Sequence, residues 1–269
     1  MPNFFFKGII LLALFASTFS SCSKKEGNKV VIKTTEGEIL IELFDDTPKH
    51  KANFLKLAKE GYYNDLLFHR VIKEFMIQGG DPDSRKADTT AILGEGDPGY
   101  MIDAEFRPNH IHRKGALAAA RTSDEENPEK KSSGSQFYIV QGKQFTEVEM
   151  NSLEIKTNKK RMAALYNSIL NKKLTELRDN YDQLAFQKIM AQVKDSVENV
   201  LMPLNTFVIP KESREIYKTE GGTPHLDGNY TIFGQVLKGF DVIDKIASKE
   251  TDSNDRPKKD VKIITIKVL

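Results

Sequence analysis

The chain has 269 residues, of which 39% are hydrophobic and 29% are charged. This length and composition suit one or two globular domains with a sizeable core. The formal net charge is only +2, from 40 basic and 38 acidic residues. With no long block of one sign, the chain has no general attraction to nucleic acid, and we set that class of partner aside.

The N-terminus has the pattern of an export signal. Lys7 precedes a run of apolar and small residues that ends at Cys22, and this run is too short to span a bilayer comfortably. Residues 1–21 resemble a bacterial lipoprotein signal peptide, which implies cleavage before Cys22 and lipid attachment to it. The lipobox of that class prefers leucine where this chain has Phe19. An ordinary secretory signal followed by a chance cysteine is the alternative.

Cys22 is the only cysteine, so no disulfide can form within the chain. The polar residues 22–29 read as a tether between a lipid anchor and a folded domain. We therefore expect an extracytoplasmic protein held to a bacterial membrane on its periplasmic or cell-surface side. Stable anchoring of this kind takes more than one acyl chain.

From Val30 the pattern is typical of β-structure. A hairpin is expected around Glu36-Gly37, with Ile39, Ile41 and Leu43 on one face. Thr47 and Pro48 then predict the start of a helix that Gly61 ends. Further strands are expected in LFHRVI, EFMIQGG, GALAAAR, SQFYIV, YTIFGQVL and VKIITIKVL, with a short helix in FDVIDKIA between the last two.

Many short strands with two small helices predict a mainly β fold, a closed antiparallel barrel capped at its ends. We assign residues 30–142 to its first part and residues 222–269 to its second part. Residues 143–221 between them are an expected α-helical insertion. It begins with a capping box, Thr146 and Glu149, and is expected to stop at Pro203.

The insertion carries two apolar stripes that are shifted relative to each other. One follows Leu170, Leu174, Leu177, Tyr181 and Leu184, and the other follows Phe186, Ile189, Val193, Val197 and Val200. One straight helix would point these stripes in different directions. A break near Asn171 or Asp179-Asn180, giving a helical hairpin, is therefore the preferred interpretation, and a continuous coiled-coil helix is the alternative.

Four blocks of the chain carry a resemblance to a known family. They are FHRVIKEFMIQGGD (residues 68–81), GALAAAR (115–121), GSQFYIV (134–140) and TPHLDGNYTIFGQV (223–236). In this order the blocks resemble the cyclophilin family of peptidyl-prolyl cis-trans isomerases. The resemblance covers roughly residues 29–142 and 222–269, and it implies a cyclophilin-like barrel whose groove is interrupted in sequence by the helical insertion.

The chemistry of that family needs an arginine. The bond before proline has a rotation barrier near 18–20 kcal/mol because the nitrogen lone pair is delocalised into the carbonyl. A fixed guanidinium that donates to the prolyl nitrogen stabilises the twisted amide and not the planar one. Arg70 is the candidate, because neither lysine nor histidine offers the same planar fork.

The resemblance assigns the other site residues. Gln78 lies beside Arg70 as the second catalytic residue and hydrogen-bonds the substrate carbonyl. Backbone groups at Ala120 and Arg121 are expected to hold the peptide in an extended form. The proline pocket and the rest of the groove are assigned to Phe75, Met76, Gln136, Tyr138, His225, Leu226 and Tyr230.

The resemblance implies no metal and no organic cofactor. His110 and His112 have the spacing of metal ligands on a strand, but no third His or Cys lies near them in sequence. His69 is expected to be a buried, hydrogen-bonded residue. The chain departs from the family pattern at three places: His225 replaces a tryptophan, Tyr230 a histidine and Tyr138 a phenylalanine. Loss of the tryptophan is expected to weaken binding of cyclosporin, the family's cyclic-peptide inhibitor.

We therefore expect a peptidyl-prolyl isomerase that acts on X-Pro bonds of unfolded or extended extracytoplasmic polypeptides and so assists folding. The insertion is expected to bind clients or to self-associate. Two alternatives stay open from the sequence. One is a non-enzymatic module that binds proline-containing peptides, and the other is a lipoprotein chaperone that uses the groove and insertion only as interaction surfaces.

Overall fold

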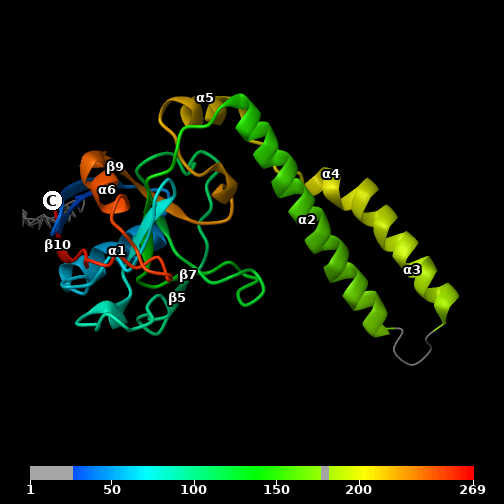
Figure 1. Cartoon of the computed structure of the whole chain (residues 1–269), viewed down its shortest axis with the longest axis horizontal. Helices are drawn as coiled ribbons and strands as arrows, with labels where there is room; N and C mark the ends of the chain where they lie inside the picture. Colours follow the sequence, from blue (N-terminus) through cyan, green and yellow to red (C-terminus); the bar gives the residue numbers. More distant parts are fainter. Residues whose placement is uncertain (1–26, 177–181) are drawn as a thin grey trace, which may run out of the picture.

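The computed structural model describes residues 27–176 and 182–269. The predicted signal peptide, Cys22 and most of the predicted tether lie outside these residues, as do Leu177, Asp179, Asn180 and Tyr181. Figure 1 shows a rounded β-rich body and a long helical arm that projects from it.

The body is built on an eight-stranded antiparallel sheet with the strand order β10-β1-β2-β9-β6-β8-β4-β3. The mainly β fold expected from the sequence is confirmed. The strands of this sheet are β1 (Lys29–Thr34), β2 (Gly37–Leu43), β3 (Arg70–Ile72), β4 (Met76–Gly79), β6 (Ala116–Ala119), β8 (Phe137–Val140), β9 (Ile232–Lys238) and β10 (Ile263–Val268). A separate two-stranded ribbon pairs β5 (Met101–Ile102) with β7 (Ser132–Ser133).

The sheet curls so that its two outer strands approach each other. Residues just before β3 hydrogen-bond to the start of β10: Asp65 N–H donates to the carbonyl of Ile263 (2.8 Å), and Ile263 N–H donates to that of Leu66 (2.7 Å). The side chains of the concave face form the main core, which includes Ile32, Ile41, Ile77, Leu117 and Ile139, all buried. Helices α1 (Pro48–Lys59) and α6 (Phe240–Ala247) pack against this core, as the sequence predicts.

Helix α1 begins where the sequence places it but is capped differently. The Thr47 side chain makes no capping bond. The Glu105 carboxylate does so instead, accepting hydrogen bonds from Lys49 N–H (3.2 Å) and His50 N–H (3.0 Å). Thr47 does lie at the N-cap position, but the prediction that its side chain caps the helix is wrong. The carboxylate of a distant loop accepts the hydrogen bonds of these N–H groups instead.

The insertion leaves and re-enters the body at adjacent points. Lys143 and Gly222 pair by backbone hydrogen bonds, of which the one from Gly222 N–H measures 3.0 Å. Gly142 has a φ of +64°, and a Cβ at this position would lie 2.4 Å from the Cα of Gly222. Only glycine allows this close approach with that backbone angle.

The arm is a helical hairpin, so the preferred interpretation of its sequence holds. Helix α2 (Glu147–Glu176) runs outward, and α3 (Gln183–Ser196), a π-helical turn (Val197–Leu201) and α4 (Met202–Asn205) return beside it. The capping box is confirmed by three hydrogen bonds between Thr146 and Glu149. Asn171 lies inside α2 and makes no break.

Two expectations for the arm are wrong. The helical segment does not stop at Pro203, which is the second residue of α4 and directly follows the π-helical turn, where the regular hydrogen bonding is already changed. Leu184 (60% exposed) and Val200 (56% exposed) of the two expected stripes face solvent, whereas Val193 and Val197 are buried. Each helix of the hairpin packs against only one other helix. The side chains of a stripe that do not face that helix therefore remain exposed to solvent.

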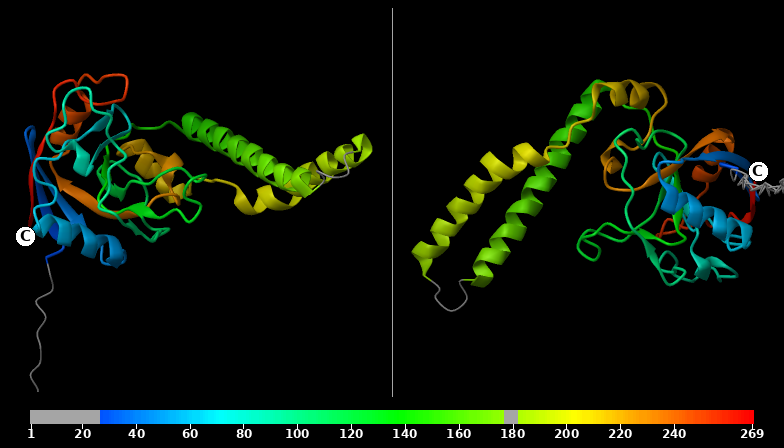
Figure 2. Two further views of the ribbon diagram at one scale, coloured as in Figure 1. Left: turned by 90° about the horizontal axis from the view of Figure 1, so that it is seen from below. Right: turned by 180° about the vertical axis from the view of Figure 1, so that it is seen from behind.

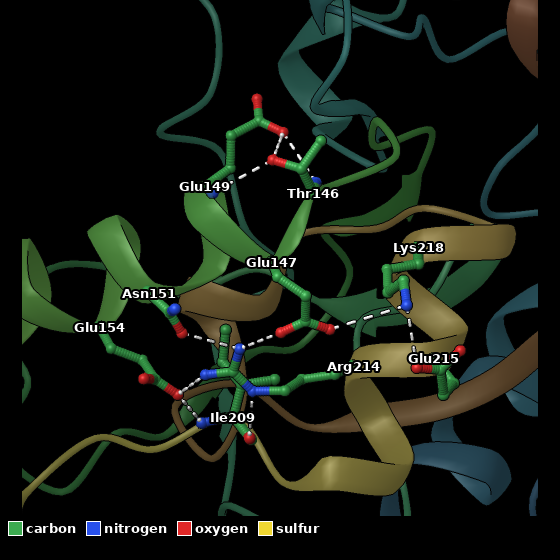
Figure 3. Close-up of polar contacts among 9 residues, drawn as sticks. All are labelled: Thr146, Glu147, Glu149, Asn151, Glu154, Ile209, Arg214, Glu215 and Lys218. Carbon is green, nitrogen blue, oxygen red and sulfur yellow. Dashed lines mark hydrogen bonds and ion pairs between the residues drawn. The ribbon is translucent and has the colours of Figure 1, made fainter.

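Helix α5 (Lys211–Thr219) joins the arm to the body (Figure 3). Arg214 on this helix bonds Glu147 (2.8 Å), Asn151 (3.0 Å) and Glu154 (2.7 Å) of α2. Beneath it, Tyr217 packs with Met150 in a small apolar cluster of its own. Helix α5 is thereby fixed to the base of α2 on both a polar and an apolar side.

Candidate active site

The candidate site lies on the convex face of the sheet, and strand alternation puts it there. In β3, β4, β8 and β6 the pairs Arg70 with Gln78, Gln78 with Tyr138, and Tyr138 with Ala118 lie directly opposite each other. Cross-strand partners share a face of a sheet. Their neighbours Ile77, Leu117 and Ile139 point the other way into the main core.

A cavity of about 330 Å³ covers this row of residues. Arg70 and Gln78 lie on its polar side. Its apolar wall comes from a second cluster that the convex face forms outside the main core. Of the residues assigned from the sequence, the cavity is lined by Arg70, Phe75, Met76, Gln78, Ala120, Arg121, Tyr138, Leu226 and Tyr230.

The two remaining assignments lie at the margin of this cavity. Gln136 is buried beside it, where its Oε1 accepts from the Gln78 amide (3.0 Å) and its Nε2 donates to the carbonyls of Gly94 (2.9 Å) and Gly96 (2.7 Å). This fixes the orientation of Gln78. His225 is largely exposed and stacks on Phe75 at a ring distance of 5.7 Å.

Arg121 is a structural part of the wall. Its Nε donates to the carbonyl of Asn229 (2.8 Å), it pairs with Asp124 (2.7 Å), and its guanidinium lies 4.6 Å from the centre of the Tyr230 ring. The backbone of Ala120 is also engaged, since its N–H donates to Gln136 O (3.0 Å) and its carbonyl accepts from Ser133 N–H (2.8 Å). Pairing with a substrate strand therefore cannot use the Ala120 N–H.

A family model described as "Cyclophilin type peptidyl-prolyl cis-trans isomerase/CLD" matches residues 29–176 and 207–268. The chain belongs to the cyclophilin family. It is 31% identical, over 89% of its length and 91% of theirs, to proteins of Staphylococcus aureus and Staphylococcus epidermidis that are named as peptidyl-prolyl cis-trans isomerases. The protein is thus a peptidyl-prolyl isomerase of the cyclophilin type.

Two further similarities agree with this assignment. A Streptococcus pyogenes protein named as a bifunctional phosphatase/peptidyl-prolyl cis-trans isomerase is 34% identical over 90% of this chain, and the chain spans 39% of that longer protein. The crystal structure of a Cryptosporidium parvum cyclophilin has a TM-score of 0.53 at 23% identity, covering 90% of this chain and 98% of that one. The latter supports the fold alone.

The cyclophilin cleft also contains residues that the sequence did not single out. Leu93, Gly94 and Glu95 complete its lining. They belong to a loop without periodicity, which is held in place by the buried carboxylate of Asp81 as it accepts from Gly94 N–H. The signal for this contact is absent from the local sequence, because Asp81 and Gly94 are brought together only by the fold.

His69 also lines the cleft and differs from its expectation. It is buried as expected, but neither ring nitrogen has a hydrogen-bond partner among the described residues. His112, one of the two histidines with ligand-like spacing, is bound to Asp227 and Tyr138. Within residues 27–176 and 182–269 there is no group of three or more potential metal ligands.

Proposed function

We propose that the cleft around Arg70 is the isomerase site and that the protein works outside the cytoplasm, where it assists the folding of other proteins. The observation that carries the first part is the single row of Arg70, Gln78 and Tyr138 across three strands, beside an apolar pocket of suitable size. This row combines a permanent charge, an amide and an aromatic wall on one rigid surface.

In this proposal the two sides of the cleft do different work. Phe75, Met76 and Leu226 hold the pyrrolidine ring, since aromatic and thioether groups suit its apolar surface. Arg70 donates to the prolyl nitrogen as its lone pair becomes localised in the twisted amide. Gln78, oriented by Gln136, uses its second amide hydrogen to bond the carbonyl oxygen of the substrate.

The test is a protease-coupled assay with an Ala-Pro tetrapeptide. Arg70→Ala is expected to lower kcat/KM about 100-fold, the effect of removing one preorganised donor worth about 3 kcal/mol. Arg70→Lys is the matched control, because it keeps the charge but loses the fork, and its activity should stay close to that of Arg70→Ala. Nearly full activity in a folded Arg70→Ala variant would contradict the role of this cleft.

The proposed location rests on the sequence of residues 1–22, and the body indicates only at which end an anchor would attach. Leu269 N–H donates to Lys29 O (2.9 Å), so the first described residues lie beside the C-terminus, at the end of the body away from the arm. A lipid on Cys22 would therefore attach on the side of the body opposite the arm. In the described part of the chain, no helix is both long and apolar enough to cross a membrane.

Intact mass spectrometry of protein extracted from membranes tests the anchor. A mature chain that begins at Cys22 and carries the mass of acyl groups is expected. A mature chain without lipid, or one that begins elsewhere, would contradict the anchor and favour an ordinary secretory signal.

The arm is proposed to hold client chains beside the cleft. Its apolar side chains Leu184 (60% exposed) and Leu204 (78% exposed) offer contacts to an unfolded chain.

Removing the outer part of the arm tests this role. Asn158 and Phe207 are joined by two hydrogen bonds, so residues 160–205 can be replaced by a short Gly-Ser linker without disturbing α5. Turnover of a tetrapeptide should be kept, and catalysis of proline-limited refolding of a protein should fall. Equal loss of both activities would contradict a client-holding arm.

A further inference from the structure

A line of hydrogen bonds connects the insertion with the floor of the cleft. The hydroxyl of Tyr217, on α5, donates to Oδ2 of Asp227 (2.6 Å). Oδ1 of Asp227 bonds both the backbone N–H (2.8 Å) and Nδ1 (2.9 Å) of His112. Nε2 of His112 is in turn bonded to the hydroxyl of Tyr138 (2.9 Å). Tyr217 and His112 are fully buried.

The donors and acceptors along this line determine one another. Burial, and then the charge of Asp227, raise the pKa of Tyr217 far above its usual range, so its hydroxyl keeps its proton and donates. Because Asp227 is an acceptor, Nδ1 of His112 carries the hydrogen in this bond. Nε2 is then left to accept from the Tyr138 hydroxyl. Each group has one role, and the line has one consistent arrangement.

The series of hydrogen bonds meets the wall of the cleft at two residues, Tyr138 and Asp227. The Tyr138 ring is part of the cavity wall, and Tyr230 meets it edge-on at a ring distance of 5.8 Å. Asp227 directly follows Leu226, another wall residue, at the end of the 3₁₀ turn Pro224–Leu226. A shift of the Asp227 carboxylate would therefore move both the aromatic and the aliphatic side of the pocket.

The residue types support a specific role. A phenylalanine at position 138 would need no partner, whereas the buried hydroxyl of Tyr138 does. His112 supplies that partner only while Asp227 holds its ring. Asp227 in turn has one carboxylate oxygen that is bonded from α5. The insertion thus supplies, through Tyr217, the hydrogen bond at one end of a series whose other end, Tyr138, lies in the wall of the cleft.

We propose that Tyr217 is a positioning residue of the isomerase site, through which helix α5 of the insertion sets the shape of the proline pocket. This inference rests on the proposed function of the cleft. Tyr217 does not touch the reacting bond, so its hydroxyl affects how well the proline ring is bound and not how fast the bound amide rotates, which depends on Arg70.

Tyr217→Phe removes only the hydroxyl and keeps the ring in its apolar cluster. NMR line-shape analysis of an Ala-Pro peptide measures the dissociation constant and the rate of isomerisation on the enzyme separately. We expect the dissociation constant to rise about fivefold, with the on-enzyme rate changed less than twofold. Tyr166→Phe is the matched control, since its hydroxyl contacts only the arm residue Met190 among the described contacts, and no change is expected.

A double-mutant cycle distinguishes positioning from a general loss of stability. In a Tyr138→Phe background His112 no longer has to hold a hydroxyl, and only the effect through Leu226 remains, so Tyr217→Phe should raise the dissociation constant clearly less than fivefold. The same fivefold effect in both backgrounds, or no effect in either, would overturn the proposal. Arg70→Ala identifies the other failure: if it leaves isomerisation intact, the cleft assignment itself is wrong, whatever Tyr217→Phe does.

Discussion

The side chain of Arg70 contacts Asp255, with Nε and Oδ2 3.4 Å apart, and the N–H of the next residue, Val71, donates to the Asp255 carbonyl (2.8 Å). The C-terminal loop thus contacts the side chain of the candidate catalytic arginine and the backbone of the residue that follows it. The printed contact is made by Nε, the nitrogen nearest the aliphatic part of the side chain. The Asp255 carboxylate is therefore suited to orient the guanidinium for work in the cleft.

Asp255→Asn should lower kcat/KM about two- to fivefold, because a half-exposed ion pair contributes up to about 1 kcal/mol. The difference between wild type and variant should shrink when the tetrapeptide assay is run at 0.5 M salt instead of 0.05 M. Glu250→Gln is the control: this exposed carboxylate pairs with Lys258 (3.4 Å) in the same region and should have no effect. A difference that does not depend on salt would argue against electrostatic positioning.

His69 predicts a pH dependence of stability. Burial lowers its pKa to about 4, although Asp81 opposes this and Arg70 and Arg256 add to it. The unfolded chain titrates near 6.5, so below that pH it binds a proton that the folded protein does not. Above pH 6.5 His69 is neutral in both states, and the free energy of unfolding keeps its full value. As the pH falls from 6.5 towards 4, protonation of the unfolded chain lowers the free energy of unfolding.

Urea unfolding at pH 7.5 and pH 4.5 measures this effect. The free energy of unfolding should fall by about 2–3 kcal/mol from His69 alone, at about 1.4 kcal/mol per pKa unit. His69→Gln should show a correspondingly smaller fall. His50, whose pKa is also lowered by burial, adds to the slope in both proteins and cancels in the comparison. Equal slopes in the two proteins would mean that His69 is not held in its neutral form.

His225 predicts a change in inhibitor binding. Its imidazole stacks on Phe75 at the rim of the cleft, where the family pattern has an indole with a larger apolar area and an N–H donor. His225→Trp is expected to tighten cyclosporin binding about tenfold, which corresponds to about 1.4 kcal/mol. Isothermal titration calorimetry measures this directly, and His225→Phe separates the gain in area from the gain of the donor. Unchanged affinity in both variants would place the inhibitor away from this rim.

The residues on the convex face of the sheet could be predicted from the sequence, because the alternation of side chains along a strand is a local pattern. Alternation in EFMIQGG and SQFYIV puts Gln78 and Tyr138 on the face opposite Ile77 and Ile139, and the structure agrees. The Thr146–Glu149 capping box could also be predicted, since its partners lie three residues apart.

What could not be predicted depends on contacts between distant segments. Glu105 replaces Thr47 as the cap of α1 across more than fifty residues, and no local pattern marks it. The same holds for the loop at Gly94 and for the bond from Tyr217 to Asp227. In each case a carboxylate satisfies N–H or O–H groups that another element leaves free, and only the folded arrangement selects which carboxylate does so.

Arg214 connects α5 to α2 (Figure 3). These bonds hold α5 in the position from which Tyr217 reaches Asp227. The side chain of Arg214 is 16% exposed and bonds three residues of α2, while Glu154, 19% exposed, also accepts from Ile209 N–H (2.7 Å). Arg214→Met would leave Glu154 without its cation. We expect the free energy of unfolding to fall by about 1–3 kcal/mol.

Lys218→Met is the matched control on the same helix. Lys218 is 38% exposed and lies 3.8 Å from Glu147, so its loss should cost less than about 0.5 kcal/mol. Hydrogen exchange of the α5 amides should speed up in Arg214→Met and not in Lys218→Met, because the half-buried pair fixes the helix and the exposed one does not. If Arg214→Met loosens α5 in this way, it should also weaken peptide binding in the cleft, as is expected of Tyr217→Phe. Faster exchange with unchanged peptide binding would show that the arm and the cleft are independent.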